Sequence, residues 1–536
     1  MTWFQHAVFY ELYPRAFADG NGDGWGDFGG ILERLDYLEW LGVDCIWLTP
    51  IYPSPLRDDG YDISSFYGIH PQYGTIEEFR LVVDALHARG MKIIPDLVIN
   101  HTSDQHPWFR MARQSKTSPL RDYFVWSEAP DRYSDSRIIF IDTEQSNWAL
   151  DPISEQYYWH RFYSSQPDLN YDNPQVRQAM LDVMKYWLDL GVDGFRVDAV
   201  PYLFEREGTT CENLPETHDY LKQMRRFMDD HYPGRTLLGE ANQWPRDLLP
   251  YFGDGDEFQM NFHFPLMPRL YMALAQADRT SIINILADTP GIPDGCQWGT
   301  FLRCHDELTL EMVNQEEREF MWDFYAPDAR QRINLGIRRR LAPLMNNDRQ
   351  KMLLLYSMLF TLPGTPVLYY GDQIGMGDNI NLFDRNGLRT PMQWDDGLNA
   401  GFSNADPTAL YAPVIDDPVY GYKQVNVAAQ HADPDSLLNR VRHMIHTFKA
   451  LPVLSNGDLN WLLDAPVSVL AFWRSSGTDT VLALHNLSSS TVQVPLGQQF
   501  AARQMTDLLT GETITTAEYL PLKAHEFRWL RPVGDR

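Results

Sequence analysis

Several carboxylates follow short apolar runs of the sequence, at the positions where buried strands would end. Asp198 closes the run GFRVD, Glu240 follows TLLG, and Asp306 follows GTFLRCH. One ionised carboxylate can attack an anomeric carbon while a protonated one donates to the leaving oxygen, and these two roles define retaining glycoside chemistry. The residue types therefore indicate glycosyl transfer or hydrolysis. Hydride transfer or aldol chemistry would need a cofactor-binding glycine loop or a strand-end lysine, and the sequence offers neither.

The local setting of each carboxylate suggests its role. Arg196 stands two residues before Asp198, and we expect it to keep that carboxylate ionised by lowering its pKa. Glu240 follows an apolar run, a setting that favours the protonated acid. We therefore predict Asp198 as the nucleophile, Glu240 as the general acid/base and Asp306 as their partner. A retaining mechanism places the two reacting carboxyl groups about 5–5.5 Å apart.

Further polar residues share these strand ends. The run MKIIPDLVINH supplies Asp96, Asn100 and His101, and His305 stands beside Asp306. Asp96 lies deepest in its run, so we predict a structural role for it. Each residue alone could be a solvated or paired charge. Several buried charges at one place cost free energy unless they are paired or used, and this favours a common active site.

Eight apolar runs must position these residues, and amphipathic stretches separate them. The runs are AVFYELYP, VDCIWLTP, MKIIPDLVINH, VDGFRVDAV, TLLGEAN, EFQMNFHF, GTFLRCHDE and PVLYYGD. Continuous apolar runs are typical of parallel strands covered by helices. Helix signals between them include the capping pair Thr75 and Glu78, Pro174 at a first helical position and the terminal Gly42. The alternation predicts an α/β protein with a closed (β/α)8 TIM barrel, and a doubly wound open sheet is the alternative.

Two long insertions and a change of pattern divide the chain. We expect residues 1–100 and 173–455 to form the barrel, and residues 101–172 to form an inserted domain after the third strand. Residues 307–355 form a further insertion after the seventh strand. From residue 456 to 536, alternating runs such as TVLALHNLS predict a C-terminal antiparallel β-sandwich. Insertions at the active face of a barrel shape the substrate pocket.

Composition limits the partners. The 536 residues carry a formal net charge of −27, which argues against nucleic acid and anionic membranes and favours a neutral or cationic ligand. The N-terminal segment has no leader pattern and no long uncharged apolar run appears, so we expect a cytoplasmic protein without membrane spans. The four cysteines lack metal-binding or disulfide-framework spacing. They are Cys45, Cys211, Cys296 and Cys304.

Two groups of oxygen-bearing residues suggest metal sites. The segment DGNGDGWGD resembles the first half of a calcium-binding loop but lacks the final bidentate glutamate. Its candidate ligands are Asp19, Asn21, Asp23 and Asp27. We expect calcium or magnesium there, with a plain Asp/Gly turn as the alternative. The second group combines Asn100 and Asp168 with residues 202–205.

The strand-end segments together resemble a known family. DLVINH, GFRVDAV, LLGEAN and FLRCHDE are similar to the four signature regions of the α-amylase family of glycoside hydrolases, and QPDLNYDNP is similar to a fifth region. The resemblance covers essentially the whole chain. PYLFEREGTTCENLPETH, FLRCHDELTLEMV with EERE, NLGIRRRLAPLMNND and MGDNINLFDRNGLRTPMQW resemble the members that interconvert maltose and trehalose. Oligo-1,6-glucosidases and sucrose isomerases share RTPMQW and QPDLN, but usually not the other three segments.

The resemblance implies roles around a glucose bound in the −1 subsite. Asp198 forms a β-glucosyl-enzyme, Glu240 protonates the departing sugar, and Asp306 binds the 2- and 3-hydroxyls. His101 and His305 are implied to bind hydroxyls of the same glucose ring, and Arg196 is implied to orient Asp198. Asp58 and Tyr61 would close the blind end of the pocket, with Arg389 paired to Asp58. Phe162 and Gln166 would face the sugar in the +1 subsite.

The resemblance also bears on metals and on closure of the pocket. It implies calcium at Asn100, Asp168 and Glu205 with the carbonyls of Tyr202 and Leu203, with magnesium as an alternative to calcium at the second site and no organic cofactor. Cys304 departs from the family, which usually has asparagine there.

Closure of the pocket can be predicted as well, because isomerisation demands a closed pocket. We predict that Arg137 and Glu307 form a gating ion pair, and two solvated charges are the alternative.

The expected activity is therefore intramolecular transfer of glucose between maltose and trehalose, with some hydrolysis to glucose. The expected partners are small disaccharides, and a homo-oligomer stays open. Alternatives within the family are a hydrolytic α-glucosidase, an oligo-1,6-glucosidase or a sucrose isomerase. A non-enzymatic relative should lack members of the triad and carry a membrane segment, and the sequence shows neither feature. A glucan-binding role for the C-terminal sandwich lacks paired aromatic residues to support it.

Overall fold

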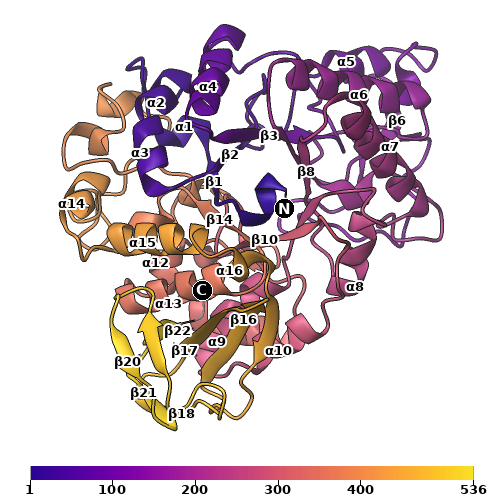
Figure 1. Ribbon diagram of the computed structural model, residues 1–536. Helices are drawn as coiled ribbons and strands as arrows, with labels where there is room; N and C mark the ends of the chain where they lie inside the picture. Colours follow the sequence, from indigo (N-terminus) through magenta and orange to yellow (C-terminus); the bar gives the residue numbers. More distant parts are fainter. Residues whose placement is uncertain (1, 535–536) are drawn as a thin grey trace.

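A closed barrel of eight parallel strands forms the centre of the molecule in the computed structural model, which describes residues 2–534 (Figure 1). The strands follow the order β1-β14-β10-β9-β8-β7-β3-β2 around the barrel. Their bounds are β1 Phe9–Leu12, β2 Cys45–Leu48, β3 Lys92–Val98, β7 Gly194–Asp198, β8 Thr236–Gly239, β9 Met260–Phe262, β10 Gln297–Phe301 and β14 Thr365–Tyr369. Each predicted run overlaps one of these strands, so the barrel is confirmed and the open-sheet alternative is wrong.

Helices cover the outside of the barrel, and their ends match the sequence signals. Thr75 caps α4 by accepting the Glu78 amide, while Glu78 bonds back to the Thr75 amide. Asn173 caps α6, which begins at Pro174. The main helices are α2 Phe28–Glu33, α3 Leu35–Leu41, α4 Ile76–Ala88, α6 Pro174–Asp189, α7 Pro215–His231, α9 Leu266–Gln276, α10 Thr280–Ala287, α13 Arg349–Thr361, α14 Val427–Ala432, α15 Leu437–Lys449 and α16 Pro452–Asn456. Shorter helices are α1 Pro14–Phe17, α5 Pro107–Ala112, α8 Pro245–Leu248 and α12 Leu341–Leu344.

The chain between β3 and α6 forms a small separate unit. Its sheet has the order β4-β6-β5, with β4 at Trp126–Ser127, β5 at Trp148–Asp151 and β6 at Gln156–Trp159. An aromatic cluster fills its interior, with Tyr133, Trp148 and Trp159 packed together. An isolated bridge joins His101 to Asp168. The unit therefore begins and ends beside the active end of β3.

A second small sheet follows β10. Strands β11 (Leu308–Thr309), β13 (Gly336–Ile337) and β12 (Arg332–Ile333) pair in that order, and α11 (Gln315–Tyr325) connects β11 to β12. We call these three strands, with the residues adjoining β11, the wall sheet. Leu308 and Leu310 are fully buried on one face. Strand alternation therefore turns Glu307, Thr309 and Glu311 to the opposite face.

The C-terminal part is all β and packs below the barrel, beside α13 and α16 in Figure 1. A six-stranded antiparallel sheet lies with a two-stranded one, as predicted for a sandwich. Trp529 donates its indole N–H to Ser357 of α13 at 2.8 Å, which ties the sheet to the barrel. The strands are β15 Asp458–Trp461, β16 Val469–Ser476, β17 Asp479–Asn486, β18 Val492–Pro495, β19 Gln504–Asp507, β20 Thr513–Thr515, β21 Tyr519–Leu522 and β22 Phe527–Pro532.

Two chain-wide features follow from residues 2–534. No helix in this range is both long enough and apolar enough to cross a membrane. All four cysteines are free and buried.

Candidate active site

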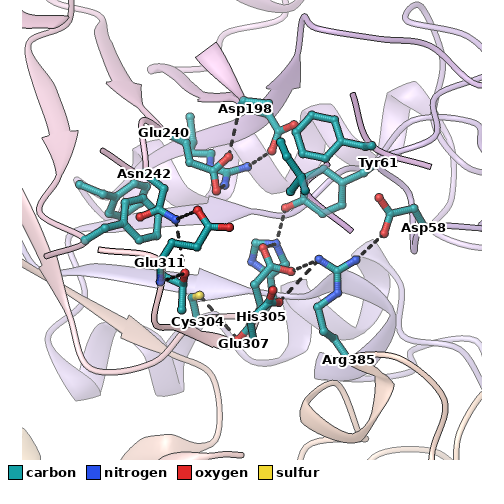
Figure 2. A pocket seen from close by; sticks show the side chains of 18 of the residues that line it. Asp58, Tyr61, Asp198, Glu240, Asn242, Cys304, His305, Glu307, Glu311 and Arg385 are labelled. Carbon is teal, nitrogen blue, oxygen red and sulfur yellow. Dashed lines mark hydrogen bonds and ion pairs between the residues drawn. The ribbon is translucent and has the colours of Figure 1, made fainter. Parts of the chain in front are cut away.

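A cavity opens at the carboxyl ends of the barrel strands. It is lined by the predicted triad Asp198, Glu240 and Asp306, together with residues of the inserted unit and of the wall sheet. In Figure 2, Asp198 and Glu240 lie on one side of the cavity, and His305, Glu307 and Arg385 lie on the other. A bound sugar ring would therefore lie between the reacting carboxylates and a charged opposite wall.

Arg196 holds the two reacting carboxylates. Its Nη1 donates to Asp198 Oδ1 at 2.7 Å and to Asp96 Oδ1 at 2.5 Å, and its Nη2 lies 2.6 Å from Glu240 Oε1. The guanidinium is buried, so solvent screens its attraction to Asp96, Asp198 and Glu240 less than it would at the surface. Asp96 lies behind Arg196 and does not line the cavity, in line with its predicted structural role.

The protonation of this pair differs from the prediction. Burial and the nearby Glu240 carboxyl raise the pKa of Asp198 well above its ordinary value, and Arg196 only partly offsets them. The expectation that Arg196 would set a low pKa for Asp198 was therefore wrong in its net direction. Two carboxyl groups that share one guanidinium are best satisfied by one proton between them. Retaining chemistry needs this state, with one acid and one base.

Asp306 is held ionised on the opposite side. Burial alone would raise its pKa, but His305, Arg385 and Arg389 lower it well below the ordinary value. His305 lies between Asp306 and Glu11, at 3.0 Å from Asp306 Oδ2 and 2.5 Å from Glu11 Oε1. Burial lowers the pKa of His305, yet these two carboxylates raise it to about 10. Asp306 is thus a fixed, ionised hydrogen-bond acceptor in the cavity wall.

The arginine partner of Asp58 was wrongly assigned. Arg385, not Arg389, reaches Asp58, with Nη2 2.8 Å from Oδ1, and its Nη1 lies 2.7 Å from Asp306 Oδ1. Arg389 instead pairs with Asp59 and donates to Asp306 Oδ1 at 2.9 Å. Both arginines come from one loop and lie four residues apart, which sequence spacing alone could not separate.

Other predicted residues fall around the closed end of the cavity. Tyr61 stacks on His305 at a centroid distance of 5.2 Å and donates to Asp96 Oδ2 at 3.0 Å. His101 lines the cavity and contacts the Tyr61 carbonyl through Nε2 at 3.2 Å. Phe162 lines it as well, beside His101. All three therefore line the cavity, and the place of Phe162 beside a +1 sugar stays a prediction.

Gln166 occupies a different place from the predicted one. Its side chain is fully buried, donates to Asp58 Oδ2 at 2.9 Å and does not line the cavity. Its position supports Asp58 from behind, and the predicted contact with a +1 sugar was wrong.

The predicted gate pair is not formed. Arg137 instead contacts Glu311, with Nη1 3.1 Å from Oε2, and Glu212, with Nε 2.9 Å from Oε1. It also donates to the Tyr202 hydroxyl at 3.1 Å. Glu307 lies 4.0 Å from Arg385 instead. The residues Glu307, Thr309 and Glu311 alternate along one strand, so Glu311 is the member of this row that meets the inserted unit.

Glu307 is nevertheless part of the pocket. Its side chain lines the cavity, and Oε2 is buried without a hydrogen-bond partner among the described residues. Burial raises the pKa of Glu307 to about 7, against the lowering effect of Arg385. The Glu307 carboxyl therefore accepts hydrogen bonds when it is ionised and can donate one when it is protonated. It lies on the cavity wall opposite Asp198 and Glu240 (Figure 2).

Comparison with known proteins matches this site and fold. The chain matches the family described as "Alpha amylase, catalytic domain" over residues 11–321 and 336–457, and "Maltogenic Amylase, C-terminal domain" over residues 461–529. The chain belongs to the α-amylase family. The catalytic-domain match covers most of the chain, and it includes every residue of the triad.

Within the α-amylase family, the chain is similar to enzymes named for trehalose. It is 55% identical to the trehalose synthase/amylase TreS of Mycobacterium tuberculosis, with 99% of this chain and 90% of that protein covered. It is 51% identical to the trehalose synthase of Pimelobacter sp. strain R48, with 99% and 96% covered. Identity falls to 30% for the oligo-1,6-glucosidase of Parageobacillus thermoglucosidasius. Sequence identity is thus higher to the trehalose synthases than to the oligo-1,6-glucosidase of the same family.

Solved structures of the family share the whole fold. The trehalulose synthase MutB from Pseudomonas mesoacidophila MX-45 is 28% identical, with a TM-score of 0.81 and 99% of both chains covered. The isomaltulose synthase from Klebsiella sp. LX3 is 28% identical, with a TM-score of 0.82, and the match covers 99% of this chain and 100% of that one.

Several pocket residues were missed from the sequence. Glu11 is fully buried at the end of β1, and a charged residue inside the apolar run AVFYELYP was the available signal. Asn242 and Glu311 bond to each other at 2.9 Å. Asn242 stands two residues after Glu240, so the strand-end rule could have found it. Phe140 lies in a loop of the inserted unit, where no periodic signal exists.

Cys304 lines the cavity. Its thiol lies 3.9 Å from the Asp306 carbonyl, a weak contact at most. Burial raises the pKa of this thiol, so it stays neutral. The triad geometry does not depend on it.

The second predicted metal site has the character of a cation site. Asn100 Oδ1, Asp168 Oδ2 and Glu205 Oε1 are all buried without hydrogen-bond partners among the described residues. Burial raises the pKa of Asp168 to about 8 and that of Glu205 well above its ordinary value. Oxygen ligands without partners are what calcium binds, so these residues fit the ion.

The first predicted metal loop uses its oxygens differently. Asp19 accepts the amides of Gly22 and Gly24, and Asp27 accepts those of Gly20 and Gly30. Asn21 and Asp23 also accept nearby amides, and both are exposed. These bonds close the loop without an ion, so calcium or magnesium there stays a prediction.

Proposed function

We propose that this enzyme interconverts maltose and trehalose by retaining double displacement, with glucose as a side product. The observation that carries the proposal is the contact between the inserted unit and the cavity wall: Arg137 reaches Glu311 and Tyr202, two residues that line the cavity with Asp198 and Glu240. The similarity to trehalose synthases at 51–55% identity supports the same assignment. A hydrolase benefits from an open path for water, whereas an isomerase must keep its freed sugar inside.

In the first step the α-1,4 bond of maltose breaks. Asp198 forms a bond to the anomeric carbon, and the proton held by Glu240 passes to the departing O4 of glucose. Arg196 contacts both carboxylates, so it stays in place as the negative charge moves between them. The ionised Asp306, fixed by Arg385 and His305, accepts bonds from hydroxyls of the distorted ring.

In the second step the freed glucose must turn before it attacks. Its anomeric hydroxyl forms the new bond to the anomeric carbon, Glu240 takes the hydroxyl proton, and the bond to Asp198 breaks. Two inversions give net retention and an α,α-1,1 linkage. Water reaching the glucosyl-enzyme instead gives glucose, so the ratio of products depends on how well the pocket excludes water.

The decisive experiment is product analysis from maltose. We expect trehalose as the main product, with a smaller amount of glucose, and trehalose should give maltose in return. The Asp198→Asn variant should form neither product, because no glucosyl-enzyme can form. Glucose alone from the wild-type enzyme would favour the α-glucosidase alternative, and activity in Asp198→Asn would overturn the nucleophile assignment.

We also propose that calcium is held by Asn100, Asp168 and Glu205 with the carbonyls of Tyr202 and Leu203. The unpartnered buried oxygens support this proposal. When bound, the ion would neutralise the two carboxylates between the inserted unit and the barrel. Chelation should lower the thermal midpoint, and calcium should restore it more fully than magnesium. A midpoint unchanged by chelation and by added calcium would contradict the site.

The four free cysteines support a further proposal, that the enzyme works in the reducing cytoplasm on neutral disaccharides.

A further inference from the structure

A short segment of the inserted unit, residues 137–142, forms the roof of the pocket, and we call it the strap. Ile139 and Phe140 in the strap line the cavity. Phe140 packs on Phe162 and Tyr163, at centroid distances of 5.6 and 4.4 Å. The side chains of Ile139 and Phe140 in the strap therefore form part of the cavity wall.

The strap is fastened to the wall sheet at both ends. Among residues 2–534, two polar contacts join them. Arg137 Nη1 lies 3.1 Å from Glu311 Oε2 at the first end. At the other end, the Asn334 amide N–H donates to Asp142 Oδ2 at 2.7 Å. The two contacts lie at the two ends of the strap, so together they hold it against the wall sheet.

The Asn334 amide is available because of the local turn. Ile333 of β12 pairs with Gly336 of β13, so Asn334 and Leu335 form the turn between the strands. Asn334 has φ 48°, a left-handed conformation that asparagine tolerates well. Its amide lies outside the strand ladder and bonds to a carboxylate instead. Such a charge-assisted bond is stronger than one between neutral groups.

We propose that Asp142 is a positioning residue for the transfer step: it fastens the far end of the strap to the Asn334 turn and keeps the roof closed while the freed glucose turns. This inference rests on the proposed function. Asp142 is exposed to solvent, so its bond is weak enough to break and re-form as sugars enter and leave. At the other end, the Arg137 side chain makes the contact with the wall sheet.

The test measures escape of the freed glucose. The enzyme converts maltose in the presence of isotope-labelled glucose, and the label in trehalose is compared with the glucose released by hydrolysis. In Asp142→Ala, we expect both label incorporation and the hydrolysed fraction to rise roughly fivefold, as expected for loss of one charge-assisted hydrogen bond. A role in stability alone would lower total activity without changing either ratio.

Matched variants define the contact. Asp142→Asn keeps an acceptor oxygen and should restore the wild-type ratios in large part, and Asn334→Gly keeps both the amide and the turn. Asp131→Ala removes an exposed carboxylate of the same inserted unit and should change neither ratio. The combined Asp142→Ala and Arg137→Ala variant should show less than the product of the separate effects, because both changes open one roof.

The outcomes separate this inference from the proposed function. Wild-type enzyme that releases only glucose from maltose would overturn the proposed function, and the strap inference would fall with it. Trehalose formation with unchanged ratios in Asp142→Ala would overturn the strap inference alone. If Asp142→Ala folds poorly by its thermal midpoint, Asp142→Ser replaces it, because the serine side chain is too short to reach the turn.

Discussion

At the scale of single residues, the pKa values of the site carboxyl groups depend on how many positively charged side chains contact each of them. Arg196 bonds to Asp96, Asp198 and Glu240 at once. Arg196 therefore only partly offsets burial and the neighbouring Glu240 carboxyl, which raise the pKa of Asp198. Asp306 is in the opposite situation, since Arg385, Arg389 and His305 all contact it. Two groups of the same chemistry thus play different roles because of their neighbours.

The role of Glu240 leads to a first prediction. Glu240→Gln should lower turnover of maltose by about 10²–10⁴-fold, because a general acid is lost. Fluoride leaves without a proton, so release of fluoride from α-glucosyl fluoride should fall far less. The return step still needs a base, and the glucosyl-enzyme on Asp198 should accumulate and be visible by mass spectrometry. Equal losses on both substrates would contradict the assignment.

His305 leads to a second prediction, on stability against pH. Its pKa is raised in the folded protein from 6.5 to about 10, so the folded state binds a proton that the unfolded state releases above pH 6.5. The stabilisation is complete below about pH 6.5 and is lost as the pH rises to about 10, at a slope of about 1.4 kcal/mol per pH unit. Urea unfolding between pH 7 and 9 measures this slope.

The matched control for this slope is Glu11→Gln. It removes one of the two carboxylates that hold the His305 proton, while Asp306 and the Tyr61 hydroxyl remain beside the ring. The decline of the unfolding free energy with pH should therefore be shallower in the variant. An identical slope in both proteins would show that His305 is not the group responsible.

At the scale of elements, the wall sheet shows how a short strand can carry a binding surface. Leu308 and Leu310 are buried beneath it, and Glu307, Thr309 and Glu311 line the cavity. The strand period of two residues thus fixes one apolar and one polar face. Strand β13 must approach β11 closely, and Gly336 of β13 allows this because it has no side chain.

Gly336 leads to a third prediction. A Cβ atom there would lie 2.5 Å from Glu307 Cγ and 2.9 Å from the Leu308 carbonyl oxygen. Gly336→Ala should therefore separate β13 from β11, at a cost of about 1–3 kcal/mol in unfolding free energy. It should also raise KM for maltose. Gly291→Ala, where a Cβ would meet nothing within 4 Å, is the control. Equal stability of the two variants would contradict this account.

The barrel strands could be predicted from the sequence, whereas some contacts between loop residues could not. The eight barrel strands were predictable because each is a continuous apolar run, and their ends supplied Asp198, Glu240 and Asp306. The partner of Asp58 was not predictable, because Arg385 and Arg389 flank one short 3-10 helix, Asn386–Leu388, and their spacing does not show which of them turns toward Asp58. Glu307 was predicted as the partner of Arg137, whereas Glu311 is the residue that contacts it. Strand β11 has only two residues, so the sequence does not reveal which nearby side chain would reach the inserted unit.

At the scale of the whole molecule, buried arginines join the C-terminal sheets to the barrel. Arg279, at the start of α10, donates to the carbonyls of Leu463 and Val469 at 2.7 and 3.0 Å. Arg474 of β16 donates to Thr361 of α13 at 2.9 Å and to Leu454 at 2.6 Å. Burial lowers the pKa of Arg474 to about 10, although Asp458 opposes this. These arginines bond to carbonyls, not to carboxylates.

Arg474 leads to a fourth prediction. Arg474→Met should lower the free energy of unfolding by on the order of 3 kcal/mol, because buried carbonyls lose their donor. No residue of 456–534 lines the cavity, so kcat below the unfolding temperature should change little. Thermal unfolding and maltose turnover measure the two effects. Arg226→Met, at an exposed site, is the control, and equal losses in both variants would contradict the joining role.

The charge of the pocket has a consequence for discrimination among cellular sugars. The acidic residues that line it are Glu11, Asp58, Asp198, Glu240, Asp306, Glu307 and Glu311, and the arginines are Arg196 and Arg385. Even with His305 charged and one proton on the reacting pair, negative charge is in excess, within a molecule of net charge −27. A phosphorylated disaccharide would meet repulsion at long range and again inside the cavity. The enzyme can therefore select free disaccharides from their phosphate esters without a dedicated recognition element.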